Sequence, residues 1–250
     1  MSAVTIKSQR EIQLMRDAGK LLRDVHNRLE EEIKPGMSTM DLNRLGEELI
    51  RKTDSIPSFL NYEGYPASVC VSINDEVVHG IPSSKRIIKD GDIVSLDIGL
   101  IHNGYQSDAA RTHAVGNVSK EALDLIKVTR ESFFEGIKYA RAGNHLHDIS
   151  NAIGNYCIDR GYGVVRDLVG HGIGQEMHES PQIPNYPQKR KGILLMAGMT
   201  LAIEPMINIG RGDVVFGADG WKCTTEDGSL SAHYENTILI TDGEPEILTL

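Results

Sequence analysis

The chain has 250 residues, of which 40% are hydrophobic and 24% are charged, so it can bury a sizeable core. Its formal net charge of −9 argues against nonspecific binding to DNA or other nucleic acid as its main role. The N-terminal residues lack a signal-peptide pattern and no apolar run approaches about eighteen residues, which predicts a cytoplasmic protein without a membrane segment. Three widely spaced cysteines without a CxxC pair fit a reducing compartment.

The first part of the chain predicts two helices followed by strands. Residues 8–33 carry apolar side chains at helical spacing, after a capping box that begins at Ser8. A Pro-Gly pair ends this helix, and either Ser38 or Thr39 can cap a second one. Residues 53–66 are irregular and aromatic, and the segment ASVCVSINDEVVHGIP then predicts a strand, a turn and a loop.

The second part of the chain repeats this order. Residues 119–139 predict a helix, and another helix is expected to open at His147 and to run to about residue 160. After a Gly-rich bend, GVVRDLVGHGIG predicts a strand, and residues 198–204 predict the next one. The Gly- and Asp-rich residues 209–230 predict a long loop before a last strand, HYENTILI.

A constant offset of 107 residues relates the two parts. The matched pairs are Gly36 with Gly143, Asp41 with Asp148, Gly91 with Gly198, Val94 with Leu201, Leu96 with Ile203, and Asp97 with Glu204. Asp108 and Glu235 are 127 positions apart, which places about 20 extra residues in the 209–230 loop. We therefore predict one α/β (α+β) domain over residues 1–250, built from pseudo-symmetric halves, residues 8–115 and 116–250. Their antiparallel sheets would join, with helices covering one face.

Residues 91–112 form the most informative stretch. Asp97 falls within an apolar strand pattern, where Asp is normally depleted, and Asp108 lies on the returning strand after an Asn103-Gly104 turn signal. Two acids facing each other would repel, and one would take up a proton unless a bound cation removed the repulsion. A wet edge hairpin with two solvated acids is the alternative, and it stays open for this hairpin taken alone.

The pseudo-symmetry brings four acids into one predicted cleft: Asp97, Asp108, Glu204 and Glu235. Four buried carboxylates cannot all ionise without compensation, and two divalent cations would cancel their charge. Oxygen ligands with little sulfur and one imidazole suit Mn, Fe, Co or Zn. Two such ions form a clamp that activates a bridging water, a chemistry found in aminopeptidases.

Three histidines are candidates for this cleft. His171 lies in LVGHGIGQEMH, where flanking glycines allow close approach of the backbone, and we predict that it supplies the imidazole ligand. GHGIG does not have the spacing of a dinucleotide-binding motif. His79 and His178 also follow apolar runs, which favours a functional role over the structural or surface role of an average histidine.

The motifs as a set resemble a known family. They are VCVSINDEVVHGIP, DIGLIHNGYQSDAART, GHGIGQEMHESPQIPNY, TLAIEPM and HYENTILIT, and the resemblance runs from about residue 8 to residue 248. The chain is similar to bacterial-type methionine aminopeptidases of type I, which have the pita-bread fold. This resemblance implies two divalent metal ions held by five ligands, at positions Asp97, Asp108, His171, Glu204 and Glu235. It also allows for a structural monovalent cation.

The resemblance further implies removal of an initiator methionine that precedes a small residue. By the same resemblance, His79 is expected to bind substrate and move a proton, and His178 to stabilise the oxyanion of the scissile carbonyl. Glu204 is expected to act as general base as well as metal ligand. The substrate methionine would lie among Phe59, Tyr62, Tyr65, Cys70, Met177 and Trp221. Ordinary loop packing stays open as the role of the two tyrosines.

Departures from the family pattern leave side-chain specificity less certain than the metal chemistry. Phe59 stands where relatives often have Cys, Met177 where Phe is common, and Leu168 where an aromatic residue or Met is usual. The expected partners are N-terminal peptides of nascent chains, with transient ribosome contact, no membrane and a monomeric state. The start Met1-Ser2-Ala3 has a small second residue, so we predict that it is itself processed.

Two other function classes share part of this pattern. A proline-directed aminopeptidase or prolidase would share the fold and ligands but usually carries an extra N-terminal domain, and this chain begins directly at the first predicted helix. A binding module of the same fold typically lacks metal ligands, whereas all five positions are filled here.

Overall fold

The computed structural model describes residues 4–250, so the predicted processing of Met1-Ser2-Ala3 lies outside the described residues. In this part of the chain every helix is too short or too polar to span a bilayer. The α-helices are α1 (Gln9–Glu32), α2 (Thr39–Lys52), α3 (Lys120–Ile137) and α4 (Leu146–Ile158).

Local capping explains where the helices begin. Ser8 and Ser38 each accept a hydrogen bond from a backbone N–H of the first helical turn, and the acid at that position accepts one from the backbone N–H of the cap residue. Ser38 is therefore the cap of α2, which settles the alternative left open above. The Ser119 side chain caps α3 by accepting from the backbone N–H of Ala122, without a returning acid, while α4 begins just after His145, slightly earlier than predicted.

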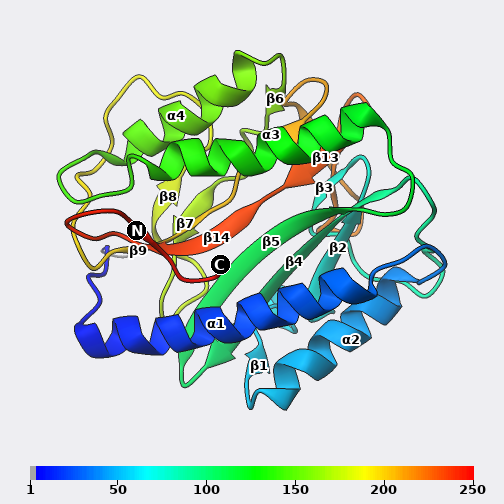
Figure 1. Cartoon of the computed structure of the whole chain (residues 1–250), viewed down its shortest axis with the longest axis horizontal. Coiled ribbons are helices and arrows are strands. Elements are labelled where there is room, and N and C mark those ends of the chain that lie inside the picture. The colour runs from blue at the N-terminus through cyan, green and yellow to red at the C-terminus, as the bar shows by residue number, and fades with distance from the viewer. Residues whose placement is uncertain (1–3) are drawn as a thin grey trace.

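The main sheet is antiparallel throughout its paired strands and runs in the order β1-β4-β5-β14-β9-β7-β8. In addition, β2 pairs with β4, and β15 pairs with β14. The central contact between β5 and β14 joins the first and second parts of the chain (Figure 1). The strands are β1 (Ile56–Pro57), β2 (Val69–Ile73), β4 (Ile93–His102), β5 (Tyr105–Ala114), β7 (Gly170–Gly172), β8 (Glu179–Ile183), β9 (Thr200–Ile203), β14 (Glu235–Leu239) and β15 (Glu246–Ile247).

The β4–β5 hairpin has the predicted turn. Asn103 and Gly104 both have positive φ, 50° and 82°, as a tight two-residue hairpin turn requires. Gly99 lies opposite Asp108 in the ladder, so Asp97 and Asp108 are offset by two positions and point to the same face of the sheet. The hairpin thus presents both acids together.

The helices cover the other face of the sheet (Figure 1). Leu96 and Ile98 of β4 pack into a core beneath α1 and α2, while Leu201 and Ile238 pack into a second core with α3 and α4. Because side chains alternate along a strand, Asp97 must point away from the helices. The mixed α/β class and the helix-covered antiparallel sheet agree with prediction, whereas the division into pseudo-symmetric halves stays a prediction.

Three of the predicted segments are wrong. The segment GVVRDLVGHGIG is not one strand but splits into β6 (Gly163–Val164) and β7, and HYENTILI breaks between β13 (Ser231–His233) and β14. The predicted 209–230 loop contains β11 (Val214–Phe216) and β12 (Cys223–Thr225), which pair with each other, and β12 also pairs with β3 (Glu76–Val78). Likewise β10 (Met206–Asn208) pairs with β6 and β13. These short strands form through pairing with distant segments, which local composition does not reveal.

Candidate metal centre

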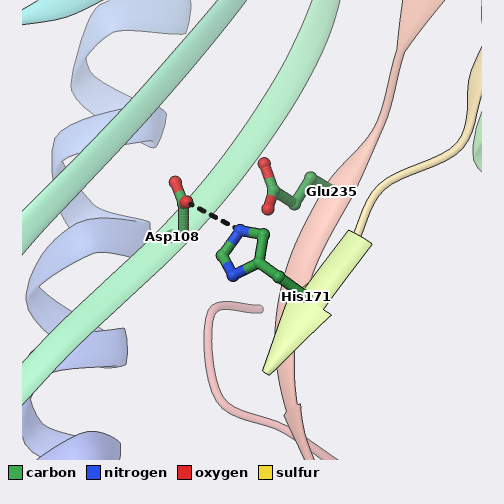
Figure 2. Close-up of side chains that lie close together, drawn as sticks. All are labelled: Asp108, His171 and Glu235. Atoms are coloured by element: carbon green, nitrogen blue, oxygen red, sulfur yellow. Dashed lines mark ion pairs between the residues drawn. The ribbon is translucent and has the colours of Figure 1, made fainter. Parts of the chain in front are cut away.

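Three buried side chains from three different strands meet on the face away from the helices. Asp108 of β5, His171 of β7 and Glu235 of β14 each offer a ligand atom, and these atoms all lie within 4.8 Å of one another (Figure 2). His171 Nε2 is 3.8 Å from Asp108 Oδ2. Two carboxylates and an imidazole at this spacing can hold a divalent metal ion.

The other two predicted ligands extend this group. Glu204 directly follows β9, and its Oε1 lies 3.7 Å from His171 Nε2. Asp97 shares the sheet face of Asp108 and lines the same pocket. All five predicted ligand positions therefore line one pocket. Among the described residues, the group whose ligand atoms all lie within 4.8 Å of one another is Asp108, His171 and Glu235.

Burial disfavours the charged form of these acids. It raises the pKa of Asp97, Glu204 and Glu235 well above the ordinary range, and the neighbouring carboxylates raise them further. Burial likewise raises the pKa of Asp108 to about 7. A bound cation would reverse this effect by favouring the carboxylates in their ionised form.

The hydrogen-bond pattern fits a metal ion. Asp97 Oδ1, Asp108 Oδ1 and Glu235 Oε1 are buried oxygens that have no hydrogen-bond partner among residues 4–250. His171 Nδ1 lies 2.9 Å from the Gly172 carbonyl and donates to it, which leaves the Nε2 lone pair facing the acids. Burial lowers the pKa of His171 to about 3, so the ring is neutral. Lone pairs that converge in this way repel one another unless a cation lies between them.

His178 lies beside the acid cluster and contacts Tyr62. Its ring centroid is 4.4 Å from that of His171, and its Nδ1 is 2.8 Å from the Tyr62 hydroxyl. Burial lowers the pKa of His178, so the ring is neutral, and a neutral ring that accepts the Tyr62 O–H at Nδ1 carries its own proton on Nε2. His178 can therefore donate a hydrogen bond to a carbonyl oxygen that binds in the pocket.

His79 lines the same pocket in a strained backbone conformation. Its φ is +59°, a value that is uncommon outside glycine and that is often retained where function requires it. Burial lowers the pKa of His79 to about 4, and its ring makes an edge contact with Trp221 at 6.2 Å. Trp221 comes from the turn between β11 and β12, so the hairpin missed by prediction contributes to this wall.

The pocket has a volume of about 150 Å³ and one mainly apolar wall. Every predicted substrate residue lines it: Phe59, Tyr62, Tyr65, Cys70, His79, Met177, His178 and Trp221. Gly99 makes this wall possible, because a Cβ there would lie 2.9 Å from Phe59 Cε1 and 3.0 Å from Met177 Cε. Leu168 instead packs against a separate core cluster.

Sequence reasoning missed two residues of the site. His233 is 2% exposed, and its Nε2 lies 3.8 Å from Glu204 Oε2 and 3.9 Å from Glu235 Oε2. The signal was available, since His233 precedes Glu235 by two positions, the spacing that puts side chains on one face of a strand. Glu63 also lines the pocket, and nothing in its sequence context marks it.

A fold and a donor set of this kind define a metal-dependent enzyme. The sequence profile of Metallopeptidase family M24 matches residues 13–242, and the chain belongs to this family. The methionine aminopeptidase of Clostridium acetobutylicum is 56% identical over 247 residues, 99% of each chain. Methionine aminopeptidase 1 of Bacillus subtilis is 48% identical over 246 residues, 98% of this chain and 99% of its own.

Comparison with solved structures gives the same family. The crystal structure of methionine aminopeptidase from Rickettsia prowazekii superposes with a TM-score of 0.97 at 41% identity, covering 99% of this chain and all of the other. The resemblance inferred from the motifs is confirmed, and with it the pita-bread fold. Membership of a metallopeptidase family, together with the buried donor set, makes this a divalent-metal site.

Proposed function

We propose that the chain is a methionyl aminopeptidase, which removes the initiator methionine from polypeptides whose second residue is small. One observation carries the proposal: a buried acid and imidazole cluster lies in the same pocket as an aromatic wall of methionine size. The relatives that match the whole chain bear the name methionine aminopeptidase, which supports the same activity.

The cofactor in this proposal is a pair of divalent ions, of Mn, Fe, Co or Zn. The residues that would hold them are Asp97, Asp108, His171, Glu204 and Glu235. When bound, such ions neutralise the carboxylates and make water a stronger nucleophile at neutral pH. The unpartnered carboxylate oxygens and the Nε2 lone pair of His171 support this assignment.

Three side chains are proposed to act on the substrate. Glu204 takes the proton from the attacking water, as a general base. His178 donates its Nε2 proton to the oxygen of the scissile carbonyl, where negative charge develops, and the Tyr62 hydroxyl holds it in the required tautomer. His79 contacts the substrate and moves a proton near the leaving amine.

The apolar wall selects the side chain that is removed. Phe59, Met177 and Trp221 offer polarisable contacts to an unbranched thioether. Contacts between sulfur and aromatic rings contribute about 0.3–1.5 kcal/mol each. A wall of this composition therefore favours methionine over a polar or charged first residue.

A peptide assay tests the proposal. With Mn or Co present, the protein should release methionine from Met-Ala-Ser and leave Ala-Pro-Ala intact. A chelator should stop the reaction, and added Mn or Co should restore it. Cleavage of Ala-Pro-Ala alone would indicate a proline-directed relative, and cleavage of neither peptide by metal-loaded protein would indicate a binding module.

We also propose that the protein works as a cytoplasmic monomer on N-termini as they leave the ribosome. The substrate itself supports this setting, since initiator methionines first become accessible there. Light scattering during gel filtration should give a mass near the 27.5 kDa of one chain. Cosedimentation with ribosomes at low salt should be measurable and should weaken as salt rises.

A further inference from the structure

The first described residues contact Glu179, which directly follows the loop that carries His178. We define the N-terminal strap as residues 4–8 and the substrate loop as residues 173–178, between β7 and β8. Lys7 Nζ lies 2.6 Å from Glu179 Oε2, and the Thr5 hydroxyl donates to the same oxygen at 2.6 Å. The Lys7 and Glu179 side chains are only 5% and 10% exposed, so their ion pair is buried.

The strap is fixed by a backbone hydrogen bond to Gly198 and by its junction with α1. The backbone N–H of Lys7 donates to the carbonyl of Gly198, just before β9, at 2.8 Å. Ser8 then caps α1, so the strap leads directly into a long helix. Lys7 is therefore held by rigid elements and can serve as an anchor for the more irregular substrate loop.

The substrate loop closes tightly onto this ion pair. A Cβ on Gly174 would lie 2.4 Å from Glu179 Oε1 and 2.6 Å from Lys7 Cε, so any larger residue there would force these two side chains to shift. The backbone N–H of Glu176 points to Glu179 Oε1 at 3.4 Å. Glu179 thus receives hydrogen bonds from the strap on one oxygen and from the loop on the other.

The end of this loop supplies part of the pocket. Met177 and His178 line the pocket and immediately precede Glu179, whereas Lys7 and Glu179 do not line it. The Tyr62 hydroxyl fixes the His178 ring from one direction only, at Nδ1. The direction of the Nε2 proton also depends on where the backbone of the loop is held.

We propose that Lys7 and Glu179 are positioning residues, through which the N-terminal strap fixes the substrate loop and so places His178 and Met177. This inference rests on the proposed function for its effect on catalysis. The anchoring itself concerns only the described residues, and it can be measured without substrate or metal.

The test uses a double substitution because a single one would leave a buried charge without its partner. Lys7→Met with Glu179→Met removes both charges at similar volume. The control is Arg16→Met with Glu246→Met, which removes another long-range ion pair of the N-terminal region, 2.7 Å long, more exposed at 31% and 38%, and outside the pocket lining. Lys7→Arg serves as the conservative variant. Urea unfolding would verify that each variant folds.

Two measurements are expected to change together in the Lys7/Glu179 double variant. Amide hydrogen exchange of residues 173–179 in metal-free protein should become about tenfold faster, as expected for loss of a local anchor. The kcat on Met-Ala-Ser should fall about tenfold with a smaller change in KM, the pattern expected when a transition-state contact is misplaced. The Arg16/Glu246 control should match wild type in both, and Lys7→Arg should keep most of the activity.

The outcomes separate the two proposals. Unchanged exchange in residues 173–179 would overturn the anchoring, and faster exchange with unchanged kcat would overturn its role in positioning His178. If metal-loaded wild type left Met-Ala-Ser intact, the proposed function would fail, and with it the catalytic role of the pair. The exchange result would then still decide whether the strap anchors the loop.

Discussion

Replacing Asp108 with Asn should stabilise the metal-free protein at neutral pH, although the change removes a proposed metal ligand. Burial raises the pKa of Asp108 from 3.8 to about 7 in the folded chain. In the unfolded chain the same group ionises near its ordinary value. Between these two values the folded state keeps a proton that the unfolded state has lost.

The sign follows from this difference in bound protons. Stability falls as pH rises wherever the folded state binds more protons, so the wild-type protein loses stability between about pH 4 and pH 7. A difference of about three pKa units corresponds to roughly 4 kcal/mol of lost folding stability. This loss is complete above about pH 7 and absent below about pH 4. Asn is neutral and of similar size, so Asp108→Asn should escape the loss. Its advantage should grow from near zero at pH 4 to about 4 kcal/mol above pH 7.

Urea unfolding of chelator-treated proteins at several pH values measures this advantage. Buried imidazoles such as His113, whose pKa burial lowers to about 4, change stability in the opposite direction, but they act in both proteins and largely cancel. Asp24→Asn is a control, because that side chain is 61% exposed. Added Mn should reverse the order of wild type and Asp108→Asn. An Asp108→Asn protein that is no more stable than wild type at pH 7.5 without metal would refute the reasoning.

Three substitutions test separate parts of the pocket. Glu204→Gln should keep the fold but lower kcat at least about a hundredfold, because the general base is lost. The metal content of the variant is measured alongside. Near-native turnover would exclude Glu204 as the general base. Tyr62→Phe should lower kcat about tenfold with little change in KM, since the His178 tautomer is no longer selected. Steady-state kinetics on Met-Ala-Ser measure both constants. An unchanged kcat would contradict the role of Tyr62 in selecting that tautomer. Gly99→Ala should raise KM several-fold by displacing Met177, whose Cε would lie 3.0 Å from the new methyl group, whereas an unchanged KM would show that the wall yields without loss.

Features with a local physical cause could be predicted from the sequence. The caps at Ser8 and Ser38 act within one helical turn, so the capping residues themselves mark where α1 and α2 begin. The Asn103-Gly104 turn fixes the register of its hairpin, and period-two alternation then places Asp97 on a defined face. The 107-residue offset added long-range information, because it related Glu204 to Asp97 before any contact was known.

Features that depend on distant pairing could not be predicted. The β11–β12 hairpin forms only where β12 pairs with β3, so its Gly- and Asp-rich sequence predicts a loop. The Tyr62–His178 and Lys7–Glu179 contacts join residues more than a hundred positions apart, and no periodicity encodes them. His233 is different, since its spacing from Glu235 was informative and was not used.

The proposed activity requires divalent metal in the pocket between the strands β5, β7 and β14. Anomalous diffraction at the Mn edge, from crystals grown with Mn, tests this claim directly. We expect peaks bounded by the carboxylates of Asp108 and Glu235 and by Nε2 of His171. Peaks elsewhere, or no peak at this pocket in a well-ordered crystal, would contradict the claim.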